Sequence, residues 1–307
     1  MVKPPRLEPG DQLAIVAPAS PFDPTEFQAG VAEVERLGFK PLITEGLVER
    51  RAGYLAGDAE HRADVLGAVW RDPSVGAVIG ARGGYGSAQL LPWLDQAKAR
   101  GGCKPFVGHS DLTALLVYLT THCGLVCFHG PLVVNLSSGE AGYDRDSFLR
   151  SLTRPEPLGE LAAEGIETVR PGQAAGQLLG GTLTQLVASL GTPYAFAPPP
   201  GYVLLLDEVG ERPYRVDRML TQLIASGVLG RASAVVCGEL PGCDEQTGWP
   251  TARGVVADLL AEFPGPVLTG FPTGHTSGAA LTVPLGVTAR VVAGPEARLV
   301  VTEGAVK

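Results

Sequence analysis

A serine stands between a histidine and an aspartate in the segment KPFVGHSDLTALLVYL, which begins at Lys104. Apolar residues on both sides of GHSD are typical of a buried strand that turns into a helix. A serine at such a turn exposes its hydroxyl, and the N–H groups that open the helix point toward a developing oxyanion. Ser110 is therefore a candidate nucleophile. The match to G-x-S-x-G is partial because Leu112 replaces the last glycine, and Ser110 or Asp111 could simply cap the helix.

A second cluster, GARGGYGS, holds glycines at positions 80, 83, 84 and 86. Their spacing does not match G-x-G-x-x-G and no G-K-[ST] follows, which argues against a nucleotide site. Gly83 and Gly84 would let a substrate approach the backbone and would offer N–H groups, although a tight turn needs glycines too. Arg82 could pair with a carboxylate or could be an ordinary surface charge.

A carboxylate pair and a loop histidine complete the candidate chemistry. Asp207 and Glu208 follow an apolar strand, where either could orient a histidine or form a solvated strand end. His275 lies in the segment GFPTGHTSG, whose glycines, prolines and threonines indicate a loop. With Ser110, these residues give a nucleophile, an orienting acid and a base in the chain order Ser, Asp or Glu, His.

The remaining histidines are placed less favourably. His109 should point away from Ser110 because the two are chain neighbours, and His129, in CFHGP, is interpreted as structural. His61 and His122 fall on predicted helices. Because no histidine pair has the spacing of metal ligands, we expect neither a metal nor another cofactor.

Alternating strands and helices position these residues. The first 130 residues repeat this alternation, which predicts a mostly parallel sheet with function at the carboxyl ends of its strands. The sequence predicts an N-terminal α/β nucleophile domain over residues 1–135 and a connector over 136–170. A smaller α+β domain over 171–307 would carry the acid and the base.

Composition narrows the class of protein. The formal net charge of −8 argues against nucleic acid as a partner, because proteins that bind it usually present a basic face. The five cysteines form no C-x-x-C pair and indicate thiols in a reducing cytosol. The uncharged run 173–206 is broken by glycines, prolines and polar residues, so no membrane span is expected.

Seven stretches in order resemble one family of serine peptidases, the LD-carboxypeptidases, over nearly the whole chain. They are LEPGDQLAIVAPAS, GYLAGDAEHRADVL, ARGGYGS, GHSDLTALL with CFHGP, LLGGTLTQL with LGTPY, DEVGERPYRVDRML and GFPTGHTSGAALTVPLG. The resemblance implies a flavodoxin-like N-terminal domain, a smaller C-terminal domain, a Ser-Glu-His triad, no metal and a homodimer.

The family roles transfer by position. The resemblance makes Ser110 the nucleophile and His275 the base, with an oxyanion hole formed by the backbone of Asp111 and of the Gly83–Gly84 turn. The family glutamate, counted back from VGERPYR, falls on an aspartate here, Asp207.

Strand geometry bears on the choice of acid. Successive strand side chains point to opposite faces, so if the strand continues through residue 208 only one of Asp207 and Glu208 can reach His275. The family register selects Asp207, and Glu208 is the alternative acid if the strand ends early. We predict Asp207, which is one methylene shorter than glutamate. The strand or the His275 loop must then lie closer, or a water must bridge.

The implied activity is that of a cytoplasmic serine carboxypeptidase in cell-wall recycling. It would remove the terminal D-alanine from murein tetrapeptide, with Arg82 as a candidate partner for the substrate's terminal carboxylate. One alternative is a microcin-C-type immunity peptidase that cleaves a peptidyl-nucleotide. Another is a non-catalytic binding protein on the same scaffold.

Overall fold

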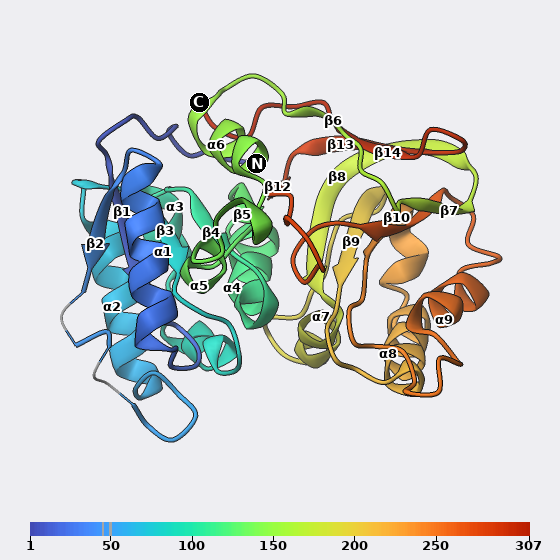
Figure 1. The fold of residues 1–307 in the computed structure, drawn as a ribbon, viewed down its shortest axis with the longest axis horizontal. Coiled ribbons are helices and arrows are strands. Elements are labelled where there is room, and N and C mark those ends of the chain that lie inside the picture. Colours follow the sequence, from blue (N-terminus) through green and yellow to red (C-terminus); the bar gives the residue numbers. More distant parts are fainter. Residues whose placement is uncertain (45, 49–50) are drawn as a thin grey trace.

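Five strands of the first half and one of the second half form a six-stranded sheet, in a computed structural model that describes residues 1–44, 46–48 and 51–307 (Figure 1). The strands are β1 (Gln12–Val16), β2 (Lys40–Ile43), β3 (Val75–Gly80), β4 (Phe106–Gly108), β5 (Cys127–His129) and β12 (Val283–Leu285). Their order is β12-β5-β4-β3-β1-β2, and all pairs except β12–β5 are parallel. The order 2-1-3-4-5 is the flavodoxin-like one, as predicted.

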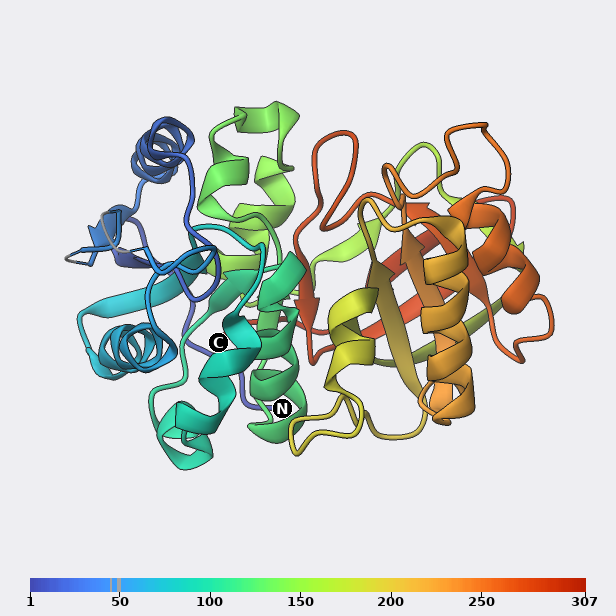
Figure 2. The same cartoon turned by 90° about the horizontal axis from the view of Figure 1, so that it is seen from below.

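Helices cover both faces of this sheet. The helix α1 (Pro24–Arg36) packs with α5 (Val133–Leu136) on one face, while α2 (Ala59–Arg71), the 3₁₀ segment η1 (Ser87–Trp93) and α4 (Thr113–Val117) lie on the other (Figure 2). Asp23 caps α1 by accepting hydrogen bonds from the N–H groups of Thr25 and Glu26, as the sequence predicts. The short helices α3 (Gln96–Gly101), η2 (Ser110–Leu112), η3 (Tyr118–His122), η4 (Gly139–Ala141) and α6 (Arg145–Thr153) complete this half.

The second sheet has eight strands in the order β6-β14-β13-β8-β9-β10-β11-β7. Its parallel centre consists of β8 (Gly172–Thr182), β9 (Tyr202–Asp207), β10 (Ala232–Gly238) and β11 (Val267–Phe271). The helices α7 (Leu183–Ser189), α8 (Pro213–Ala225) and α9 (Ala252–Leu259) pack on one face, with η5 (Leu229–Arg231) before β10 (Figure 2). A second apolar core forms between these helices and the strands.

The chain crosses the predicted domain limits in two places. Residues 136–170, predicted as a connector, supply the edge strands β6 (Gly159–Leu161) and β7 (Glu167–Arg170), which pair with β14 (Arg298–Val301) and β11. The strand β12, predicted to belong to the second domain, instead pairs antiparallel with β5, while β13 (Thr288–Ala293) returns to the second sheet. Strand partners far apart in sequence carry no local signal, so these pairings were not predictable. No helix within the described residues is long and apolar enough to span a membrane.

Candidate active site

Ser110 opens η2, in a strained turn that follows β4. The strand ends at Gly108, and Ser110 has a φ angle of +59°, in the left-handed region that side chains other than glycine rarely adopt. The predicted strand-to-helix turn is therefore present, and its geometry is that of a nucleophile elbow. The serine side chain is half-buried.

The glycine-rich loop after β3 packs directly on this elbow. A Cβ atom at Gly83 would lie 2.8 Å from Ser110 Cβ, 2.9 Å from Ser110 Oγ and 3.5 Å from the backbone nitrogen of Asp111. Only a glycine fits there without displacing the serine. Gly84 has φ of +96°, and its missing Cβ leaves room for Ser20, whose backbone N–H donates to the Gly83 carbonyl at 3.2 Å.

The side chain of Asp111 ties the elbow to its surroundings. It is buried, and its carboxylate accepts hydrogen bonds from the backbone N–H of Ser87 at 2.8 Å and from the Gln185 amide at 3.2 Å. Ser87 Oγ in turn donates to the Asp111 carbonyl at 2.6 Å. The carboxylate of Asp111 is thus held by Ser87 and Gln185, and it is the backbone nitrogen of Asp111 that lies next to Gly83.

Two arginines hold the loops around the elbow. Arg82 is exposed, and its Nη1 donates to the Pro21 carbonyl at 2.6 Å. Arg62, which the sequence analysis did not single out, is buried and donates to the carbonyls of Pro18, Gly57 and Gly86. Burial lowers the pKa of Arg62, with the charge of Asp111 acting against that shift. One guanidinium therefore fixes three loops around Ser110.

Asp207 and His275 are joined by a short hydrogen bond. Asp207 Oδ2 lies 2.6 Å from His275 Nδ1 and accepts the backbone N–H of His275 at 3.0 Å. The other oxygen, Oδ1, accepts from Thr182 Oγ1 at 2.8 Å. The loop lies close enough for direct contact because residue 274 is glycine, with φ of +62°, where a Cβ would overlap Asp207 Oδ2. The short aspartate thus reaches the histidine without a bridging water.

The electrostatics of this pair suit a general base. Burial raises the pKa of Asp207, but the nearby His129 and the hydrogen bond from His275 outweigh burial, so its pKa lies well below the usual range. Burial lowers the pKa of His275, yet the hydrogen bond and charge of Asp207 outweigh that effect and raise it above 6.5. A carboxylate that stays ionised next to a histidine holds the imidazole in one tautomer.

Glu208 points to the opposite face of β9, as strand alternation requires. Its Oε2 accepts from the backbone N–H of Thr184 at 2.8 Å and from Thr184 Oγ1 at 2.6 Å. Burial raises the pKa of Glu208. These contacts cap the start of α7, so Glu208 supports the second domain and does not contact His275.

His109, expected to point away from Ser110, lies close to two other histidines. Its ring lies 5.0 Å from the His275 ring and 5.9 Å from the His129 ring, measured between centroids. His129, interpreted as structural, lies with its Nε2 atom 3.4 Å from Asp207 Oδ1. The proximity of three imidazoles was not predictable from the sequence, because each comes from a different segment.

A polar cleft opens beside His275. It has a volume of about 270 Å³ and is lined by residues of α5, of the segment 138–142 and of the loop 274–278, including His109, Asn135, Ser138 and Thr276. Glu239 fixes the far side of the loop, because its carboxylate accepts hydrogen bonds from Thr276 Oγ1 and from the backbone N–H of Ser277.

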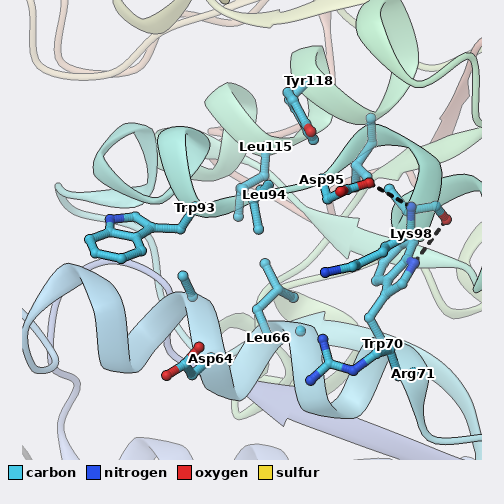
Figure 3. A pocket seen from close by; sticks show the side chains of 14 residues that line it. Asp64, Leu66, Trp70, Arg71, Trp93, Leu94, Asp95, Lys98, Leu115 and Tyr118 are labelled. Atoms are coloured by element: carbon cyan, nitrogen blue, oxygen red, sulfur yellow. Dashed lines mark hydrogen bonds between the residues drawn. The ribbon is translucent and has the colours of Figure 1, made fainter.

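A separate hollow of about 190 Å³ lies between α2, the η1–α3 region and α4, and Figure 3 shows Trp93, Leu94, Lys98 and Tyr118 around it. None of the predicted catalytic residues lines this hollow. Across residues 1–44, 46–48 and 51–307, no group of three or more His, Cys, Asp or Glu side chains could hold a metal ion.

Comparisons with known proteins match both halves of the chain. The LD-carboxypeptidase N-terminal domain matches residues 13–130, and the LD-carboxypeptidase C-terminal domain matches residues 175–291. A putative carboxypeptidase of Streptomyces coelicolor is 39% identical over 95% of this chain and 93% of its own. A murein tetrapeptide carboxypeptidase of Pseudomonas aeruginosa is 31% identical over 86% of this chain and 88% of its own.

A third relative is the microcin C7 self-immunity protein MccF of Escherichia coli, which is 28% identical over 92% of this chain and 90% of its own. A solved apo structure of wild-type MccF covers both chains completely, with a TM-score of 0.91 at 23% identity. That structure shares the two-sheet fold described above.

Proposed function

Because this chain belongs to the LD-carboxypeptidase family, a family of peptidases, we propose that it is a serine carboxypeptidase that removes the terminal D-alanine from murein tetrapeptide. The observation that carries this proposal is the short contact between Asp207 and His275, together with the left-handed backbone of Ser110 after β4. A serine that only caps a helix needs no left-handed backbone, and a carboxylate that only ends a strand would be solvated, whereas Asp207 is fully buried against His275.

In the proposed mechanism His275 takes the proton of Ser110 while Ser110 Oγ attacks the scissile carbonyl. Asp207 holds the Nδ1 proton of His275, so Nε2 is free to accept, and it stabilises the imidazolium that forms. The backbone N–H groups of Asp111 and of the Gly83–Gly84 turn stabilise the oxyanion. His275 then returns the proton to the leaving amine of D-alanine, and water releases the acyl-enzyme.

The substrate assignment rests on the relatives and on the rim of the site. Arg82, with N–H groups left over after its bond to Pro21, would bind the terminal carboxylate of the peptide. We expect tetrapeptide to be cut and pentapeptide to resist, because the residue that donates the carbonyl has the opposite configuration in the D,D bond. Equal rates on both substrates would contradict an L,D specificity.

One observation supports a second candidate, a peptidase for peptidyl-nucleotides. Tyr54 and Tyr85 are exposed and contact each other edge to face at 5.8 Å, and Tyr85 belongs to the glycine-rich loop beside Ser110. A base could stack on such a pair. The similarity to MccF is compatible with this candidate. A Tyr85→Ala variant that lost activity only on a peptidyl-nucleotide would favour it.

The deciding experiment is product analysis on purified muropeptides. The parent enzyme should release D-alanine from tetrapeptide and bind a reactive-serine probe, whereas Ser110→Ala should do neither while its thermal unfolding stays close to that of the parent. Full turnover in Ser110→Ala would refute the serine mechanism. A parent protein that binds muropeptide without releasing D-alanine or labelling would instead be a binding protein. The cytoplasmic location, the role in recycling and the homodimer are further parts of this proposal.

A further inference from the structure

His129 is a buried histidine that the mechanism above does not use. It lies at the end of β5 with no exposed surface, and its Nδ1 is 3.2 Å from Thr273 Oγ1. Its Nε2 is 3.4 Å from Asp207 Oδ1, at ion-pair distance, but makes no hydrogen bond to any residue that the structure describes. The Nε2 atom of His129 therefore faces the carboxylate of Asp207 in a buried environment. The charge of the ring depends on which of its two nitrogens carry protons.

The hydroxyl of Thr273 fixes the proton on the other nitrogen. Thr273 Oγ1 donates its one hydrogen to the carbonyl of Leu281 at 2.8 Å, since a carbonyl oxygen can only accept. The hydroxyl oxygen must then act as the acceptor toward His129. The Nδ1 atom of His129 therefore carries a proton.

The carboxylate decides the state of Nε2. A neutral ring with its proton on Nδ1 would direct the bare lone pair of Nε2 at Asp207 Oδ1, and buried polar atoms left in this way are costly. A proton on Nε2 turns the contact into attraction between opposite charges. We propose that His129 is an imidazolium ion paired with Asp207, and that it acts as a positioning residue that sets the charge which Asp207 presents to His275. This inference rests on the proposed role of the Asp207–His275 pair.

The groups around His129 are consistent with one buried cation. Asp207 is the anion, and His275 binds its other oxygen. The ring of His109 is 5.9 Å away, but its Nδ1 donates to the Gly130 carbonyl at 3.0 Å, and burial, followed by the nearby His275 and His129, lowers the pKa of His109 to about 3. His109 is therefore neutral and does not repel the charge. The backbone of Gly274 fills the remaining space, because a Cβ there would overlap both Asp207 Oδ2 and His129 Cε1.

The pairing has a consequence for the base. With His129 charged, the cluster of Asp207, His129 and neutral His275 has no net charge at rest, and it becomes a cation when His275 accepts the serine proton. His129 therefore opposes protonation of His275 and keeps its pKa from rising further. Removing the charge of His129 should raise the pH at which kcat/KM falls on the acidic side by about one unit.

The charge of His129 can be read directly by nitrogen NMR of the full-length protein with labelled histidines at pH 8. We expect one histidine with a proton on both ring nitrogens, and we expect its signal to disappear in His129→Gln and to revert to a neutral pattern in Asp207→Asn. The same signal should be present in Ser110→Ala, so the result does not depend on turnover or on the substrate. A singly protonated His129 at pH 8 would overturn the inference.

Kinetics supply the second measurement. The acidic limb of kcat/KM should move upward in His129→Gln, whereas a merely structural histidine would change kcat/KM without moving the limb. If His129→Gln does not fold, Thr273→Val replaces it: without the hydroxyl acceptor, His129 should lose its Nδ1 proton, become neutral in the NMR spectrum and shift the limb in the same direction. An unmoved limb in the folded variant would overturn the inference.

Discussion

Replacing Asp207 by asparagine tests the acid of the proposed triad with little change in shape. In the native protein both His275 contacts converge on Oδ2, at 2.6 Å from Nδ1 and 3.0 Å from the backbone nitrogen. An amide nitrogen at that place would donate to Nδ1, which moves the imidazole proton to Nε2 and prevents His275 from accepting the proton of Ser110. An amide oxygen there would keep both bonds but would remove the charge that stabilises the imidazolium.

The expected loss is large. In the serine-protease template, an asparagine that enforces the wrong tautomer lowers turnover by about 10⁴, and we expect a loss of that order here. It corresponds to about 5.4 kcal/mol of transition-state stabilisation. Stability should fall far less, by about 1–3 kcal/mol, the cost of one buried N–H group that loses its acceptor.

The assay is D-alanine release from tetrapeptide at pH 8, together with denaturant unfolding of the same samples. Glu208→Gln is the matched control: it removes a carboxylate one residue away whose bonds go to Thr184, so its kcat/KM should stay near that of the parent. A loss of less than tenfold in Asp207→Asn, about 1.4 kcal/mol, would refute the role of Asp207. A larger loss in Glu208→Gln than in Asp207→Asn would assign the role to Glu208.

Three further predictions concern the same site. Gly83→Ala should lower kcat/KM by about 10²–10³, the cost of losing one oxyanion donor, because its Cβ would press on Ser110. The control is Gly101→Ala, whose Cβ would meet nothing within 4 Å. Equal rates in the two variants would contradict the packing argument. The kcat/KM profile should fall as the pH drops through a midpoint above 6.5, since Asp207 raises the pKa of His275 and the base must be neutral; a midpoint below 6.5 would show that burial dominates. Dialysis against a strong chelator should leave activity intact, and activity that is lost and then restored by zinc would count against a serine triad.

The local parts of the site could be read from the sequence. The apolar run before Ser110 and the helix after it predict the turn, and the period of two in β9 separates Asp207 from Glu208. The glycines at 83 and 84 mark a loop that must approach another segment closely. In each case the signal lies within a few residues of the position concerned.

The parts that the sequence could not reveal depend on long-range packing. Arg62 is one charged residue of an amphipathic helix, and only the fold shows that its guanidinium meets three loop carbonyls. His129 reads as a strand residue before a Gly-Pro turn. Nothing near it in the sequence indicates Asp207, which lies at the end of β9 in the other sheet. The identity of β12 as a strand of the first sheet is likewise a property of the assembled fold.

The loop that carries His275 has one end in each sheet, since β11 before it belongs to the second sheet and β12 after it pairs with β5 of the first. A hinge between the two halves would therefore have to break the β12–β5 pairing or stretch this loop. The β12–β5 pairing thus ties the His275 loop to the sheet that carries Ser110, and under the proposed mechanism catalysis should not require closure of one half on the other. For protein engineering, the consequence is that the halves are not independent modules. A fragment that ends before the loop would expose the edge of β5, a row of unpaired backbone groups prone to aggregation, and exchange of the second half between relatives would have to carry β12 with a compatible β5.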